Sequence, residues 1–277
     1  MTGFPSFAGI RCILYPNKPT RKPERSLGMK RQRKEGMIRS LFFGIAFVSI
    51  AILLLILFFL VKAGVPIFEK VSVTEFIFGK YWYPTASPPD FGILPLVLAS
   101  LFVTLFSAVI AVPLGVMTAI YIAEIASARL KEIVKPAVEL LASLPSVVIG
   151  FFGMVVVAPF LQQTFDLPTG LNLFNASLML AFMSVPIICT ISEDAISSVP
   201  PELKEASLAL GANRIESIFR VIIPASLSGI STGIILGMAR AIGETMVVLM
   251  VAGGAAMIPG SLFDPVRPMP ASIAAEM

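Results

Sequence analysis

Two ionisable side chains, Arg240 and Glu244, interrupt an otherwise apolar stretch that reads GMARAIGETMVVLMV from residue 237 to residue 251. A charge in the middle of a bilayer costs roughly 2.5–3.5 kcal/mol on insertion scales, so the pair requires an explanation. Residues four apart lie on one face of a continuous helix, so these side chains can pair, although Arg before Glu is the less favourable order. A cation in such a place attracts anions, and the hydroxyl of Thr245 offers a further hydrogen-bond donor.

The residues allow two roles for this pair. In the first, Arg240 and Glu244 form an ion pair that holds two helices or two subunits together. In the second, they line a pathway in which Arg240 attracts an anion and Glu244 weakens the attraction enough for release. Replacing a buried ion pair by apolar residues is often neutral or stabilising, which favours the pathway role. Both roles hold if Glu244 exchanges partners between two states.

A row of small residues accompanies the pair, since Gly229, Gly233, Gly237 and Ala241 recur every four positions. Small residues on one face let two helices in a membrane approach closely. This ridge predicts that the helix is central in a bundle and that the charged pair points inward, away from lipid.

The composition is that of an integral membrane protein. Hydrophobic residues make up 56% of the 277 residues, charged residues make up 14%, and the mean hydropathy is +0.90. The sequence has no His, and Cys12 and Cys189 form no metal-binding spacing, so we expect no catalytic residues, no metal and no cofactor. An intramembrane enzyme is disfavoured for the same reason. The phosphate-binding pattern GxxxxGK[ST] is also absent, so ATP hydrolysis would have to come from a partner.

We predict an all-α, polytopic membrane fold with five spans and charged loops between them. The expected spans are residues 40–61, a second within 91–122, 138–161 with an interruption at LPSVVIG (144–150), 173–191, and 225–251. Charged loops are expected at 124–135 and 192–220.

The distribution of Lys and Arg predicts the orientation. Residues 1–39 form a basic segment, and 40–277 form the membrane domain. Sixteen Lys and Arg residues fall on the side of the N-terminus and four on the opposite side, which places the N-terminus in the cytoplasm. Because the basic segment stands directly before a span, topology explains it better than nucleic-acid binding.

The loop before the fifth span has the pattern of two helices joined at a glycine. Pro201 suits the first turn of a helix, Gly211 suits the end of one, and Pro224 marks the entry to the next span. Apolar residues at helical spacing on both sides of Gly211 give each helix one apolar stripe. Packing on the membrane surface would account for such a stripe, but the spacing suggests a more specific role.

That loop resembles the EAA loop of ATP-binding-cassette importer permeases. Glu205-Ala206-Ser207, three residues, Gly211, nine residues and then Val221 to Pro224 follow the family pattern E-A-A, three residues, G, nine residues, I-x-L-P, with conservative departures at Ser207, Val221 and Ile223. The resemblance implies that residues 192–224 are a coupling loop that docks on the ATPase subunit. Glu205 would then make a charged contact, and Gly211 would allow the turn.

Two further stretches, LLASLPSVVIGFFG (140–153) and LGMARAIGETMVVLMVAG (236–253), resemble phosphate importer permeases of the Pst type, and the second is most similar to the PstC-type subunit. The resemblance implies a type I ABC importer permease in the cell inner membrane. Its expected partners are a PstA-type second permease, ATP-binding subunits and a periplasmic or lipid-anchored phosphate-binding protein. The family has six core spans, and ASIAAEM resembles the residues before the sixth, so that span is expected to be missing.

Phosphate is the expected substrate, and molybdate or sulfate is the alternative because the coupling loop does not distinguish these oxyanions. A signalling role beside transport is also compatible with the sequence.

Overall fold

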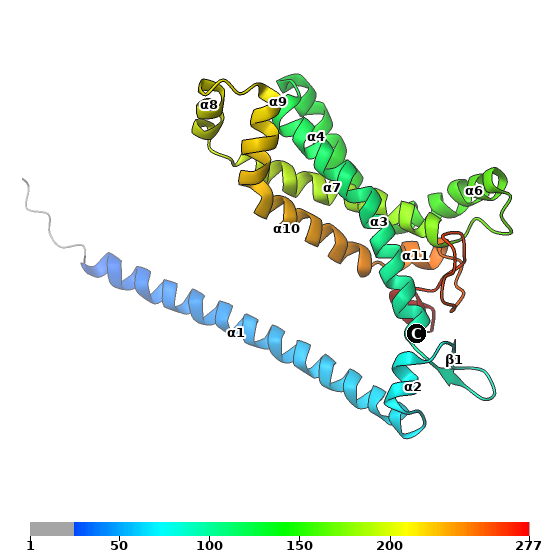
Figure 1. Ribbon diagram of the computed structural model, residues 1–277. Coiled ribbons are helices and arrows are strands. Elements are labelled where there is room, and N and C mark those ends of the chain that lie inside the picture. The colour runs from blue at the N-terminus through cyan, green and yellow to red at the C-terminus, as the bar shows by residue number, and fades with distance from the viewer. Residues whose placement is uncertain (1–24, 277) are drawn as a thin grey trace, which may run out of the picture. The chain divides into compact units, whose positions relative to one another are not determined.

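The structure is a computed structural model and describes residues 25–276, so the expectations for residues 1–24, Cys12 among them, lie outside the described part. The chain divides into two compact units, Met1–Glu69 and Lys70–Met277. In the first unit, helix α1 (Arg25–Gly64) continues into a 3₁₀ turn, η1 (Val65–Glu69) (Figure 1). Its apolar part, Ile38–Glu69, contains an 18-residue stretch with a mean hydropathy of 3.1 and confirms the first predicted span.

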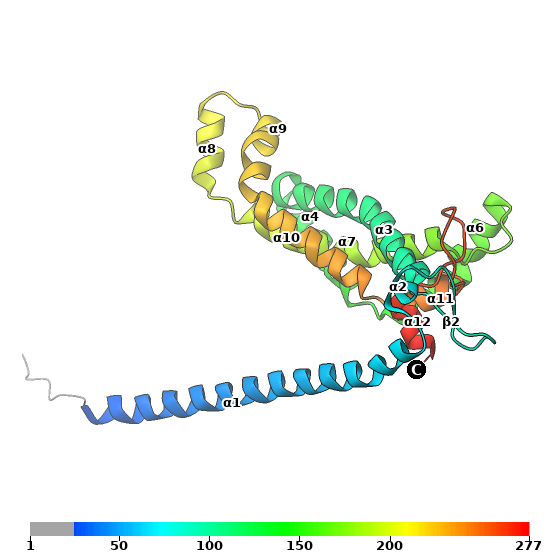
Figure 2. The same ribbon diagram turned by 60° about the horizontal axis from the view of Figure 1, so that its bottom comes forward.

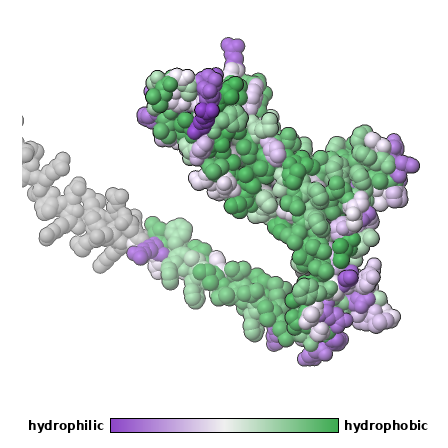
Figure 3. All heavy atoms as spheres, in the orientation of Figure 1, coloured by the Kyte–Doolittle hydropathy of each residue, from purple (hydrophilic) through white to green (hydrophobic). Residues whose placement is uncertain are grey.

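Four helical segments of the second unit are also long and apolar enough to cross a membrane. They are Leu94–Ile125, Ser146–Phe165, Leu173–Ser197 and Arg214–Ile242. In Figure 3 the middle of this unit is covered by hydrophobic residues, while hydrophilic residues gather towards its ends. The predicted all-α membrane fold with five spans is therefore confirmed.

Three helices form the centre of the second unit. They are α3 (Leu94–Ile120), which a π-helical turn η2 (Tyr121–Ile125) extends, α7 (Leu173–Ser197) and α10 (Ile223–Ile242). Both α3 and α10 pack along α7 (Figures 1 and 2). In an apolar 18-residue stretch of α7, 61% is buried, the largest share among the five spans of the described residues. The remaining helices are arranged around this centre.

The third span begins later than predicted. Helix α4 (Ala128–Ser143) stops before Leu144, and the span itself consists of α5 (Ser146–Phe152), a π-helical turn η3 (Gly153–Val157) and α6 (Ala158–Phe165). The predicted start at residue 138 is therefore wrong. Leu144 precedes Pro145 and is extended, with φ −62° and ψ 134°, because a residue before proline is disfavoured in the helical region. The segment 124–135, expected as a loop, is also largely helical.

The fifth span ends earlier than predicted. Helix α10 stops at Ile242, residues 243–245 are not helical, and a separate helix α11 (Met246–Val251) follows. The prediction of one span over 225–251 is therefore wrong. Gly243 costs about 1 kcal/mol relative to Ala inside a helix, and the Glu244 side chain accepts a hydrogen bond from the Val247 backbone N–H (3.4 Å). Both features favour a break.

Short elements lie at the end of the second unit opposite α8 and α9. Helix α2 (Val73–Phe78) precedes a hairpin of β1 (Trp82–Tyr83) and β2 (Asp90–Phe91), which pair antiparallel. After α11, Gly253 and Gly254 have φ of +90° and +72°, and the chain turns towards α12 (Met269–Glu276).

The helix–glycine–helix element is present as expected. Helix α8 (Pro201–Ala209) has proline in its first turn, Gly211 has φ +89°, and α9 (Arg214–Ser217) leads through a π-helical turn η4 (Ile218–Ile222) into α10. Asn213 and Glu216 form a capping box at the start of α9. Figure 2 shows α8 and α9 beside each other at one end of the second unit.

The small residues of α10 lie against α7. A Cβ atom on Gly229 would lie 2.3 Å from the Ala195 Cβ, and a Cβ atom on Gly237 would lie 2.6 Å from the Ile188 Cγ1. Gly233 faces Ile188 and Ser192 in the same interface, and Ala241 is buried. The missing side chains therefore set the distance between these two helices.

Gly229→Ala is expected to destabilise the protein by about 1–3 kcal/mol, because the new methyl group overlaps Ala195, which has no rotamer that would relieve the clash. The measurement is the thermal unfolding midpoint in detergent. Gly44→Ala in α1 is the control, since no atom lies within 4 Å of its added Cβ. Equal midpoints for the two variants would contradict the tight packing of α10 on α7.

Candidate functional site

Arg240 lies in the last turn of α10, and its side chain is exposed in the single subunit. A cation is favourable at this position because the carboxyl end of a helix carries partial negative charge. Among the ion pairs of the described residues there is none between Arg240 and Glu244. The pairing that the sequence allows is therefore absent from this structure, since the helix ends at Ile242, between the two residues.

Glu244 and Thr245 belong to the break between α10 and α11. The Glu244 backbone N–H donates to the Ala241 carbonyl (3.3 Å), while its carboxylate faces the first turn of α11. A carboxylate is favourable there because the amino end of a helix carries partial positive charge. Thr245 flanks α11 directly and is half-buried. Arg240 and Glu244 thus each sit at a helix end that favours their charge, without depending on each other.

The two stretches singled out by resemblance to Pst-type permeases pack against each other. A Cβ atom on Gly150 in α5 would lie 3.2 Å from the Val247 Cα in α11, and one on Gly153 would lie 2.8 Å from the Val251 Cγ1. Both Val247 and Val251 are fully buried. The segment LPSVVIGFFG therefore supports the short helix that follows the break.

Of the residues predicted to couple to an ATPase, all but Pro224 lie in α8 or in the turn between α8 and α9. Glu205 and Ala206 are exposed, Ser207 is buried, and Gly211 makes the turn. Pro224 occupies the first turn of α10, where its missing N–H costs nothing.

Large apolar side chains are exposed on the same element. Leu210 is 90% exposed, and Leu208, Ile215 and Phe219 are all more than half exposed. Exposed apolar residues gathered beside charged ones are typical of a surface that another protein covers.

Two ion pairs beside this element were not predicted from the sequence. Lys204 of α8 pairs with Glu124 of η2, and Lys135 of α4 pairs with Glu193 of α7 at 2.5 Å. The hydrogen bond to Glu193 raises the pKa of Lys135 above its usual range. The sequence predicts only a charged loop that contains Glu124 and Lys135. One feature could have indicated a special position for Glu124, since it is the first acid after a long apolar span.

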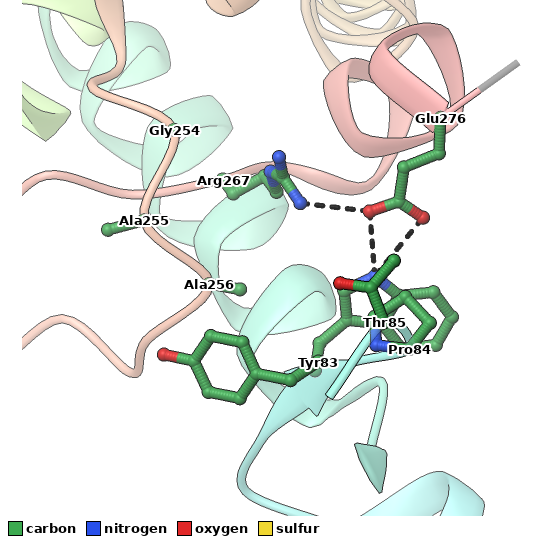
Figure 4. Close-up of a pocket in the computed structure, with 9 residues that line it drawn as sticks. Tyr83, Pro84, Thr85, Gly254, Ala255, Ala256, Arg267 and Glu276 are labelled. Atoms are coloured by element: carbon green, nitrogen blue, oxygen red, sulfur yellow. Dashed lines mark hydrogen bonds and ion pairs between the residues drawn. The ribbon is translucent and has the colours of Figure 1, made fainter. Parts of the chain in front are cut away.

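A pocket at the other end of the second unit has a volume of about 680 Å³ and is lined by the hairpin, the turn after α11 and α12. Figure 4 shows the Glu276 carboxylate facing Arg267, and the Arg267 Nη1 lies 2.9 Å from the Glu276 Oε1. The Trp82 Nε1 donates to the same oxygen at 3.1 Å. In the sequence, Arg267 stands out only as one of the four Lys and Arg residues on the side opposite the N-terminus. Within residues 25–276, no group of three His, Cys, Asp or Glu side chains could hold a metal ion.

Residues 111–265 match a protein family described as binding-protein-dependent transport system inner membrane component. The chain is 41% identical over 236 residues to a probable ABC transporter permease protein, YqgH, of Bacillus subtilis, covering 84% of this chain and 76% of that one. It is 35% identical over 221 residues to the phosphate transport system permease protein PstC of Mesorhizobium japonicum, covering 73% and 67%. Among solved structures, an inward-facing MetNI methionine ABC transporter has a TM-score of 0.45 at 25% identity, covering 61% of this chain and 74% of that one.

Gly211→Ala is expected to destabilise the α8–α9 turn by about 1–2 kcal/mol, because a side chain is unfavourable at positive φ although nothing lies within 4 Å of the new Cβ. Hydrogen exchange of the α8 and α9 amides should accelerate accordingly. Gly211→Asn should have a smaller effect, since Asn tolerates positive φ better.

The control for this experiment is Gly243→Ala, where φ is −90° and the nearest contact of the added Cβ is an ordinary 3.6 Å. Exchange in α8 and α9 should not change in that variant. Equal exchange rates in Gly211→Ala and the unchanged protein would show that the turn does not require glycine.

Proposed function

Because the chain belongs to the family of binding-protein-dependent transport system inner membrane components, we propose that it carries inorganic phosphate through the membrane as one permease subunit of an ATP-driven importer. It is a multi-pass membrane protein, and members of this family are permease subunits of transporters. The observation that carries the proposal is the position of Arg240. Its exposed guanidinium has no carboxylate within 4.0 Å among the described residues, and it lies where a helix is interrupted.

An interrupted helix at membrane depth is tolerated only where protein buries it or where it lines an aqueous cavity. Arg240 is also the only Lys or Arg between residues 225 and 251. A guanidinium offers several N–H donors in a planar fork that suits phosphate oxygens. These features support a site that binds an oxyanion transiently during transport. The names of the PstC relatives favour phosphate over sulfate or molybdate.

Glu244 completes this site in the proposal. Its carboxylate is held by the first turn of α11, so it does not neutralise Arg240 in this conformation. A nearby negative charge would keep the affinity low enough for phosphate to leave, as conduction requires weak binding. Thr245 adds a hydroxyl beside the same break. A movement of α10 relative to α11 would change the distance between the two charges.

The energy in this proposal comes from a separate ATPase that docks on α8 and α9. Glu205 supplies a charged contact, Gly211 holds the turn, and the exposed Leu210 is covered on docking. The excess of Lys and Arg supports a cytoplasmic N-terminus and therefore a cytoplasmic position of this element. A PstA-type second permease and a phosphate-binding protein complete the importer.

Arg240→Gln is expected to lower phosphate uptake at least about tenfold, because truncating one partner of a charge-assisted hydrogen bond costs roughly 1.5–3 kcal/mol. The measurement is uptake of radiolabelled phosphate into proteoliposomes that contain the whole transporter. Arg240→Lys should retain part of the activity, since it keeps the charge but not the planar fork.

Lys80→Gln is the matched control, because it removes one exposed positive charge outside the five spans. Uptake in that variant should stay near the unchanged level. Normal uptake by Arg240→Gln would refute the role of Arg240. Competition by sulfate or molybdate stronger than by unlabelled phosphate would refute phosphate as the substrate.

A further inference from the structure

One residue, Glu124, contacts both arms of the α8–α9 element. Its carboxylate forms an ion pair with the Lys204 ammonium of α8. Its backbone carbonyl accepts a hydrogen bond from the Arg214 guanidinium at the start of α9, with an N···O distance of 2.5 Å. These two cations stand on opposite sides of Gly211, so Glu124 joins the arms that the glycine separates.

The position of Glu124 explains why a single residue can serve both contacts. It lies in η2, the π-helical turn that ends the second span. The last carbonyls of a helix have no partner within it, and cations near that end are favourable. Lys131 in the same way donates to the neighbouring Ala123 carbonyl at 2.7 Å. The carboxylate and the carbonyl of Glu124 are therefore both available to the α8–α9 element.

The ion pair is shielded more than an ordinary surface pair. The Glu124 side chain is 10% exposed and the Lys204 side chain 29% exposed. Exposed ion pairs contribute little, because solvent and salt weaken them, whereas shielded pairs are screened much less. The pair of Lys135 with Asp194, whose side chain is 67% exposed, is of the weaker kind.

Most of the α8–α9 element is exposed, although Ser217 of α9 is buried. Glu205, Leu210 and Ile215 are exposed, and Ser207 is the one buried residue of α8. The element is joined through the backbone to α7 by residues 198–200 and to α10 by η4, and Glu124 adds a noncovalent attachment to the end of α3. Since α3 packs along most of α7, a displacement of its end at Glu124 reaches the centre of the bundle.

We propose that Glu124 is a positioning residue that ties both arms of the α8–α9 element to α3, so that a movement of this element is delivered to α3 as well as to α7 and α10, the spans that it joins through the backbone. This inference rests on the proposed function, in which an ATPase moves α8 and α9. Without the tie, the movement reaches the bundle only through the backbone links to α7 and α10 and the apolar contacts of η4, and part of each ATP hydrolysis is lost to rotation of α8 and α9 about Gly211.

The test uses the whole transporter in proteoliposomes and measures phosphate taken up per ATP hydrolysed. Glu124→Gln keeps the size of the side chain and the carbonyl but removes the charge. Uptake per ATP should fall about fivefold or more, while ATP hydrolysis and co-purification of the ATPase stay within about twofold of the unchanged complex. Lys204→Gln should have the same effect. Lys204→Arg keeps the positive charge, so its ratio of uptake to ATP hydrolysis should stay near that of the unchanged complex.

The double variant Glu124→Gln/Lys204→Gln should be no worse than either single variant, because both remove the same interaction. Lys135→Gln is the control, since it breaks a comparable ion pair between α4 and α7 that does not contact α8 or α9. Its ratio should stay within about twofold of the unchanged complex. If Glu124→Gln does not assemble, the Lys204 variants decide the question.

An unchanged ratio in Glu124→Gln or Lys204→Gln overturns the inference. A loss of the ATPase from the complex, with transport and hydrolysis falling in proportion, also overturns it, because the tie would then serve assembly alone. Phosphate uptake by the unchanged complex tests the proposed function separately. Absence of that uptake refutes the function itself, whereas normal uptake with unaltered ratios refutes only the role of Glu124.

Discussion

The close approach of α10 to α7 is the contact on which the rest of the second unit depends. Gly229 and Gly237 of α10 lie where any side chain would overlap α7, and a Cβ atom on Gly233 would lie only 3.1 Å from the Ser192 Oγ. Between helices in lipid there is little hydrophobic driving force, so such close packing supplies much of the attraction. It fixes the position of α10 between the two regions for which a function is proposed, the α8–α9 element at one end and the helix break with Arg240 at the other. A shift at either end must therefore pass through this interface.

Local sequence signals predict much of this arrangement. Gly211 and Pro201 predicted the two helices and their turn, and the small residues predicted the packed face of α10. These predictions work because each depends on a backbone preference or a spacing within one helix. The sequence Leu144–Pro145 is a local signal of the same kind and indicates a helix end, but the apolar character of residues 138–161 suggests one continuous span.

Local sequence signals do not predict the arrangement around the charged side chains of Arg240, Glu244 and Glu124. Hydropathy alone made residues 225–251 look like one helix, because Gly243 is only mildly unfavourable and Val247 and Val251 are fully apolar. Glu124, Lys204 and Arg214 are far apart in sequence, and only the folded chain brings them together. Charged side chains near span ends therefore need tertiary information before they can be paired. The mutual packing of residues 140–153 and 236–253 likewise depends on contacts between distant segments.

The hairpin at the end opposite the α8–α9 element has a practical consequence. Trp82 is the only tryptophan of the 277 residues, and its indole N–H contacts Glu276 at the edge of the pocket in Figure 4. Tryptophan fluorescence of the purified subunit, excited selectively over tyrosine, therefore arises from one known place. Any event that rearranges the pocket alters the polarity around that indole ring. The protein thus carries its own optical probe at the end far from the α8–α9 element, and no label is needed to follow conformational changes there.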